Sequence, residues 1–175
     1  MVTKFSEPGT TRRNNQRIVT VLLWIALSTG LAVSIFSLVE ELCMATACSD
    51  AASFVFFGVG MALFGCAYFS FILVILFLRR KNLWFGLILT AMVFSGVGAE
   101  LRLLWIQKYI IGSWCPLCVT ICCCLFFSAV LLLIERVLDR RAGDVLVSTT
   151  GWMSLVITMI VVGLAVAVMG VQALS

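Results

Sequence analysis

Two cysteines three positions apart, Cys115 and Cys118, are the residues of this chain best suited to carry chemistry. They lie in the segment Ser-Trp-Cys-Pro-Leu-Cys (residues 113–118), which leads into a long apolar run. Ser113 can be the N-cap of a helix, and Pro116 is tolerated in the first turn because the N–H that it lacks would have no partner there. The start of a helix favours a thiolate, which is the attacking species in disulfide exchange. The spacing therefore predicts a redox pair that can close into a disulfide.

A metal site is the alternative for this pair, because half of many zinc sites has the same Cys-X-X-Cys spacing. The chain contains no histidine, and a tetrahedral zinc site would need a second pair of ligands. We therefore favour the redox interpretation and assign no metal ligand.

The composition identifies the surroundings of these cysteines. Hydrophobic residues make up 63% of the 175 residues and charged residues only 11%, whereas soluble domains are about half apolar. The apolar runs are too long for membrane β-strands, so helices are the architecture that satisfies the backbone in lipid. We expect an all-α integral membrane protein in contact with the bilayer and not with nucleic acid.

Five apolar runs are long enough to cross a hydrocarbon core of about 30 Å. The first exceeds the roughly 7–15 residues of a signal-peptide core, so we expect it to be retained. The five runs cover residues 18–39, 52–78, 83–106, 114–134 and 147–173. The expected parts are a tail (1–17), a four-helix bundle (18–134) with a cysteine loop (40–52), a further loop (135–146) and a fifth helix (147–175).

The basic residues are distributed unevenly about these spans. Cytoplasmic loops are enriched in Lys and Arg, so the side that carries most of them is expected to be cytoplasmic. Arg102 and Lys108 are the two on the opposite side. Ten of the twelve fall in the tail and in the loops after the second and fourth spans: Lys4, Arg12, Arg13, Arg17, Arg79, Arg80, Lys81, Arg136, Arg140 and Arg141. The N-terminus is predicted to be cytoplasmic. The loop after the first span and the turn with Cys115 and Cys118 are predicted to face the periplasm or cell exterior.

A second cysteine pair, Cys43 and Cys48, lies in the exported loop. Four intervening residues allow a turn that brings the two Cα atoms within the roughly 4.4–6.8 Å of a disulfide, and disulfides persist in this compartment. A loop pair can meet a soluble protein, and a pair at a helix start can meet a lipid-soluble acceptor. The two pairs together indicate an electron relay; the alternative is that Cys43 and Cys48 only staple the loop.

The remaining chemical side chains receive simpler interpretations. Cys122 follows Cys118 by four residues and therefore lies on the same helical face, next to any acceptor of that thiol. Glu100 and Arg102 are expected to extend toward the membrane surface without a catalytic role. Three further cysteines inside apolar runs are expected to pack as small hydrophobic residues: Cys66, Cys123 and Cys124.

Residues 18–133 resemble bacterial homologues of vitamin K epoxide reductase. The resemblance is carried by the loop pair whose second Cys is followed by Ser, by Phe-Gly-Val-Gly-Met-Ala-Leu-Phe-Gly (residues 57–65), and by residues 107–118 with their Trp-Cys-Pro-X-Cys turn. It implies a four-helix bundle around a quinone, often with a fifth helix, that oxidises a thioredoxin-fold partner. The functionally analogous oxidase DsbB is less similar, because there the helix-start pair precedes the mobile pair.

The resemblance also implies a role for each cysteine. Cys43 exchanges with the partner, Cys48 passes electrons to Cys115, and Cys118 faces the quinone, either ubiquinone or menaquinone. Ser53 matches the family's serine in this region. Met61 and Cys122 stand where the vertebrate enzyme has Asn and Tyr, which argues against vitamin K epoxide as substrate. The expected quinone contacts are Cys118, Cys122, Met61 and Ser53.

The expected function is that of a membrane thiol oxidoreductase in the bacterial inner membrane that supports disulfide bond formation. Because the chain continues only about two residues beyond the last apolar run, we expect a separate thioredoxin-fold (DsbA-like) partner. A non-enzymatic membrane subunit, in which the cysteines form structural disulfides or bind metal, is the alternative.

Overall fold

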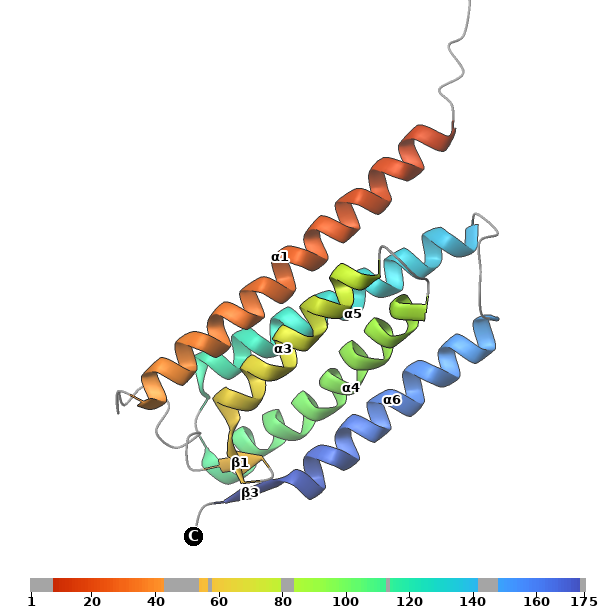
Figure 1. Ribbon diagram of the computed structural model, residues 1–175. Coiled ribbons are helices and arrows are strands. Elements are labelled where there is room, and N and C mark those ends of the chain that lie inside the picture. The colour runs from red at the N-terminus through yellow and green to blue at the C-terminus, as the bar shows by residue number, and fades with distance from the viewer. Residues whose placement is uncertain are drawn as a thin grey trace, which may run out of the picture.

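Five long helices account for most of the chain in the computed structural model (Figure 1). The structure describes residues 8–42, 54–56, 58–79, 84–112, 114–141 and 148–173. The helices are α1 (Pro8–Leu42), α3 (Met61–Leu78), α4 (Trp84–Ile106), α5 (Pro116–Arg141) and α6 (Thr149–Gly170), and a π-helical segment η2 (Gln107–Ile111) continues α4. Three short strands complete the described elements: β1 (Phe54–Phe56), β2 (Val59–Gly60) and β3 (Val171–Ala173).

All five helices are long and apolar enough to span a membrane. Large apolar side chains also remain exposed along every one of them, for example Ile25, Phe71 and Val161, as expected where the surrounding solvent is lipid. The predicted all-α membrane architecture is therefore confirmed, and the chain is a multi-pass membrane protein.

Four of the helices form a closed bundle. Around the bundle α1 contacts α3, α3 contacts α4, α4 contacts α5, and α5 returns to α1. Helix α6 lies outside this ring and packs along α4, so that α1 and α6 are on opposite sides of the molecule (Figure 1). The bundle core contains fully buried side chains from all four helices: Leu23, Leu27, Phe69, Ile72, Leu89 and Leu125.

The contact between α4 and α6 is the closest in the molecule because glycines on both helices remove the side chain at the crossing. A Cβ added to Gly98 would overlap the carbonyl oxygen of Ile160, and one added to Gly163 would overlap that of Ser95. Small residues at such crossings let helix backbones approach in membranes, where van der Waals contact drives association. The fifth helix therefore contacts the backbone of α4 directly at this crossing.

A small antiparallel sheet joins two segments that are far apart in the sequence. Strand β1 pairs with β2 on one side and with β3 on the other, in the order β2-β1-β3. Gly58 (φ 80°) adopts the left-handed conformation between β1 and β2, which glycine tolerates best. Figure 1 shows β1 and β3 side by side at the end of the bundle where α6 ends.

Because of the sheet, two of the helices are shorter than the predicted spans. The second helix begins at Met61 instead of residue 52, and the fifth ends at Gly170 because β3 follows it. A three-residue apolar strand inside an apolar run has no distinctive periodicity. Its partner β3 is distant in the sequence, so no local pattern could have indicated the pairing of β1 with β3.

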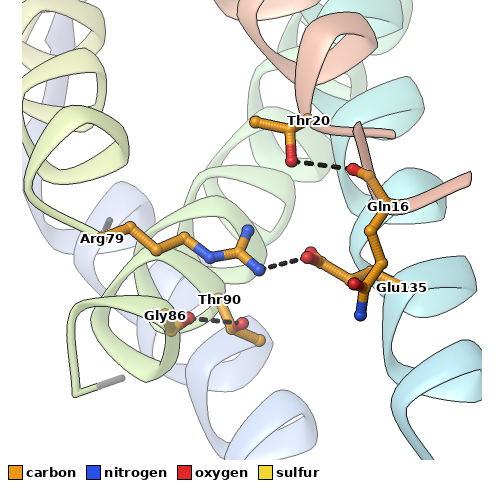
Figure 2. Close-up of polar contacts among 6 residues, drawn as sticks. All are labelled: Gln16, Thr20, Arg79, Gly86, Thr90 and Glu135. Atoms are coloured by element: carbon orange, nitrogen blue, oxygen red, sulfur yellow. Dashed lines mark hydrogen bonds and ion pairs between the residues drawn. The ribbon is translucent and has the colours of Figure 1, made fainter. Parts of the chain in front are cut away.

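An ion pair connects α3 and α5 at the opposite end of the bundle (Figure 2). The Arg79 guanidinium, just after α3, donates to the Glu135 carboxylate in the last turns of α5. Nearby, the hydroxyls of Thr20 and Thr90 each donate over 2.9 Å to the carbonyl oxygen four residues earlier (Figure 2). These polar side chains thus have partners within the apolar bundle, as buried polar groups require.

Candidate functional site

A cavity of about 140 Å³ lies inside the bundle at the end that carries the sheet. We call this the cavity end: α1 and α6 end here, and α3 and α5 begin here. Each of the five helices contributes to the lining, and so do β1 through Phe56 and β3 through Val171. The lining is largely apolar, and the cavity lies among helices long and apolar enough to span a membrane.

Aromatic rings form one wall of the cavity. The Phe56 and Phe64 ring centroids are 4.3 Å apart, and the Phe64 and Tyr68 rings stack at 6.4 Å with an interplanar angle of 15°. The Tyr68 hydroxyl donates to the Met92 carbonyl oxygen over 2.7 Å, and the absence of a side chain at Gly96 leaves room for that hydroxyl. An apolar cavity of about 150 Å³ holds a benzene ring, so this cavity suits a flat six-membered ring.

Three polar side chains meet at the cavity: Glu100, Gln107 and Cys118. Glu100 is 9% exposed and Gln107 is 4% exposed. The Gln107 side chain interacts with the Cys118 sulfur, and its Oε1 atom is buried without a hydrogen-bond partner among the described residues. A buried acceptor without a donor costs free energy, which indicates that a ligand completes this site.

The two cysteines of the Cys-Pro-Leu-Cys turn have different positions in the helix. The Val119 N–H donates to the Cys115 carbonyl oxygen over 3.1 Å, so Cys115 is the N-cap residue, Pro116 is the first helical residue and Cys118 lies in the first turn. Pro116 occupies the position where proline is most favourable. Cys118 is therefore inside the helix, and Cys115 lies just before its first turn. The predicted cap, Ser113, is outside the described residues.

Their chemical states also differ. Cys115 is buried and disulfide-bonded, whereas Cys118 is a free thiol that lines the cavity. The two are therefore not bonded to each other in this structure. The other described cysteines are all free thiols: Cys66, Cys122, Cys123 and Cys124.

Only some of the remaining predicted site residues lie at the cavity with Cys118. Met61 lines the cavity with Cys118. Cys122 is buried one turn further along α5 and is not among the described lining residues. The predicted Cys43, Cys48 and Ser53 lie outside the described residues. Within the ranges that the structure describes, His, Cys, Asp and Glu side chains form no group of three that could hold a metal ion.

The expectation for Glu100 is wrong, because its side chain is buried at the cavity instead of extending to the membrane surface. The sequence contained a signal for this. Gly96, Glu100, Leu103 and Gln107 are spaced by four, three and four residues, which places them on one face of a helix, and all four line the cavity. Tyr68 is a further lining residue that the sequence analysis did not single out.

Neither a family model nor a curated protein or solved structure matches this chain. Its function must therefore be argued from the cysteines, the cavity and the polar groups around them.

Proposed function

We propose that the protein is a quinone-dependent thiol oxidoreductase of the type implied by its resemblance to the vitamin K epoxide reductase family. The observation that carries the proposal is the free Cys118 thiol at a ring-sized apolar cavity, three residues from the disulfide-bonded Cys115. A structural staple would give no reason for a thiol at a cavity wall.

The lining fits a quinone in size and chemistry. The aromatic wall of Phe56, Phe64 and Tyr68 offers surfaces for a flat ring, and the unpaired Gln107 Oε1 atom can accept a hydrogen bond from the hydroxyl of a reduced ring. Ubiquinone and menaquinone both carry such a ring. When bound, the quinone supplies the capacity to take up two electrons and two protons.

The chain's own thiols account for the electron transfer by thiol–disulfide exchange. In the proposed sequence the Cys48 thiolate attacks Cys115 of a Cys115–Cys118 disulfide; a Cys48–Cys115 bond forms and Cys118 is released. A bonded Cys115 beside a free Cys118 is the state that this step leaves. Cys43 then attacks Cys48, which forms Cys43–Cys48 and frees Cys115. The Cys115 and Cys118 thiols finally close into a disulfide at the cavity.

The electrons enter through the loop pair. A reduced thioredoxin-fold (DsbA-like) partner, supplied as a separate protein, reduces Cys43–Cys48 and leaves with its own disulfide restored. The charge distribution of the chain supports an N-terminus in the cytoplasm and a cavity end on the periplasmic face of a bacterial inner membrane. Disulfide exchange with an exported partner requires this orientation.

The test is quinone reduction by the purified protein in lipid vesicles supplied with a reduced thioredoxin-fold substrate. We expect loss of the quinone absorbance and formation of one substrate disulfide per quinol. A membrane subunit with purely structural disulfides would leave both the quinone and the substrate thiols unchanged, and that result would overturn the proposal.

A further inference from the structure

We propose that Glu100 is the proton donor to the acceptor bound in the cavity and that Gln107 holds the acceptor oxygen that receives this proton. The inference rests on the proposed function and names two residues of the same site. It is carried by the joint placement of the carboxyl, the amide and the Cys118 thiol at one wall of the cavity.

A carboxyl group buried within a membrane span is costly and usually functional. Glu100 lies inside the candidate span Trp84–Ile110, and among the described residues no basic side chain forms an ion pair with it. The titratable groups that interact with it come from the facing helices: Tyr68 of α3 and Cys118 and Cys122 of α5. The fold thus places a proton-carrying group beside the thiol that would deliver electrons.

This placement contrasts with the other buried carboxyl of the bundle. Glu135 is buried to a similar extent but is neutralised by Arg79 at the opposite end. The structure therefore gives Glu135 a partner within the protein and leaves Glu100 facing the cavity.

Gln107 supplies the second element of the site. Its Oε1 atom is buried without a described partner, and its side chain also contacts the Cys118 sulfur. A carboxamide carries an acceptor oxygen and a donor NH₂ group, so rotation about its last bond lets it donate to the carbonyl of an oxidised ring or accept from the hydroxyl of a reduced one. Gln107 lies in the π-helical segment, a type of irregularity found frequently at functional sites.

The step balances. Closing the Cys115–Cys118 disulfide forms one S–S bond and releases two electrons and two protons, and reduction of a quinone to a quinol consumes the same number. Glu100 gives its proton to the oxygen held by Gln107 and recovers one from the Cys118 thiol. The proton of Cys115 accounts for the second hydroxyl.

The test compares Glu100→Gln with the wild type in two measurements. Quinone turnover should fall by about 10²-fold or more, the usual contribution of a general acid, while quinone affinity, measured by fluorescence titration of the oxidised protein, stays unchanged. Infrared difference spectra of the quinone-free protein should contain a carboxylic acid carbonyl band that responds to reduction of the cysteines by a dithiol and is absent in Glu100→Gln. The band should persist in the matched control Glu135→Gln.

A second pair of variants separates chemistry from folding. Glu100→Asp should retain part of the quinone turnover, and Glu100→Asn should not. Both variants shorten the side chain, but only aspartate keeps a carboxyl group that can donate a proton. Gln107→Leu should instead weaken quinone binding by about tenfold, as expected for one lost hydrogen bond.

The outcomes are distinguishable from those that test the function itself. Wild-type turnover in Glu100→Gln or in Glu100→Asn, or a carbonyl band that survives Glu100→Gln, would overturn the role of Glu100 while quinone reduction stands. Tight quinone binding by Gln107→Leu would overturn the role of Gln107. Failure of the wild type to reduce quinone would overturn both the proposed function and this inference.

Discussion

Cys115 and Cys118 are separated by about one helical turn, but their environments and chemical states differ. Cys115, at the N-cap, is buried and disulfide-bonded, and Cys118, in the first turn, is a free thiol at the cavity. One sulfur is thus held in a disulfide while the other faces the cavity. No other described cysteine lines the cavity.

Substitution of either cysteine of this turn should therefore abolish electron transfer to quinone. Cys115→Ser removes the sulfur that receives electrons, and Cys118→Ser removes the sulfur at the cavity. Cys66→Ala and Cys123→Ala are the controls and should leave quinone reduction largely intact, because these free thiols are not at the cavity wall. Near-normal quinol production by Cys118→Ser would contradict the relay.

The loop cysteines should not be equivalent if they form a relay. Cys48→Ala removes the resolving thiol, so a mixed disulfide between Cys43 and the partner should accumulate. Cys43→Ala should instead leave Cys48 in a disulfide with Cys115 and no partner attached. Non-reducing gels of both variants with the partner present measure this; a partner adduct in Cys43→Ala alone would reverse the assigned roles.

A motif and a resemblance singled out Cys118 and Met61 in the sequence, and both residues line the cavity. Glu100 was misjudged because a charged residue near the end of an apolar run is compatible with either the membrane surface or the bundle interior. The spacing of Gly96, Glu100, Leu103 and Gln107 indicates that they share a helical face, but only the packing of α4 against α3 and α5 determines that this face points inward.

At the scale of the elements, the crossing of α4 and α6 has no room for a side chain. Gly98 and Gly163 each meet a backbone carbonyl of the other helix. Because α4 carries Glu100 and continues directly into Gln107 of η2, the position of the fifth helix also fixes this part of the cavity lining. The fifth helix thus stabilises the site in addition to anchoring the chain.

Gly163→Ala should accordingly destabilise the protein by about 1–3 kcal/mol, the usual cost of overpacking, and lower its thermal unfolding temperature in detergent. Gly86→Ala on α4 is the matched control, because its added Cβ would meet only the Arg79 side chain at an ordinary 3.6 Å. There the better helix propensity of Ala should leave stability equal or slightly higher. Equal melting temperatures for the two variants would contradict the close crossing.

The number of helices was predictable and their ends were not. Five apolar runs must become five helices because lipid offers no other way to satisfy the backbone. The pairing of β1 with β3 depends on a contact between distant segments and leaves no periodic trace in the sequence.

For the whole molecule, the proposed orientation follows from the sidedness of its basic residues. Five spans that begin in the cytoplasm must end outside, so a reporter fused after Ser175 should be exported and one inserted at Ala142 should be cytoplasmic. Alkaline phosphatase and green fluorescent protein fusions at the two positions measure this directly. Both reporters on the same side would remove the fifth span from the topology.

The pairing of β1 with β3 has a consequence for biosynthesis. Phe56 and Val171 line the same cavity, yet Val171 is synthesised only after α3, α4, α5 and α6. The first four spans can enter the membrane and fold around an open pocket, but its wall is complete only after α6 has been inserted and β3 has paired with β1. A ribosome-bound chain thus lacks a closed pocket until synthesis has passed the last span.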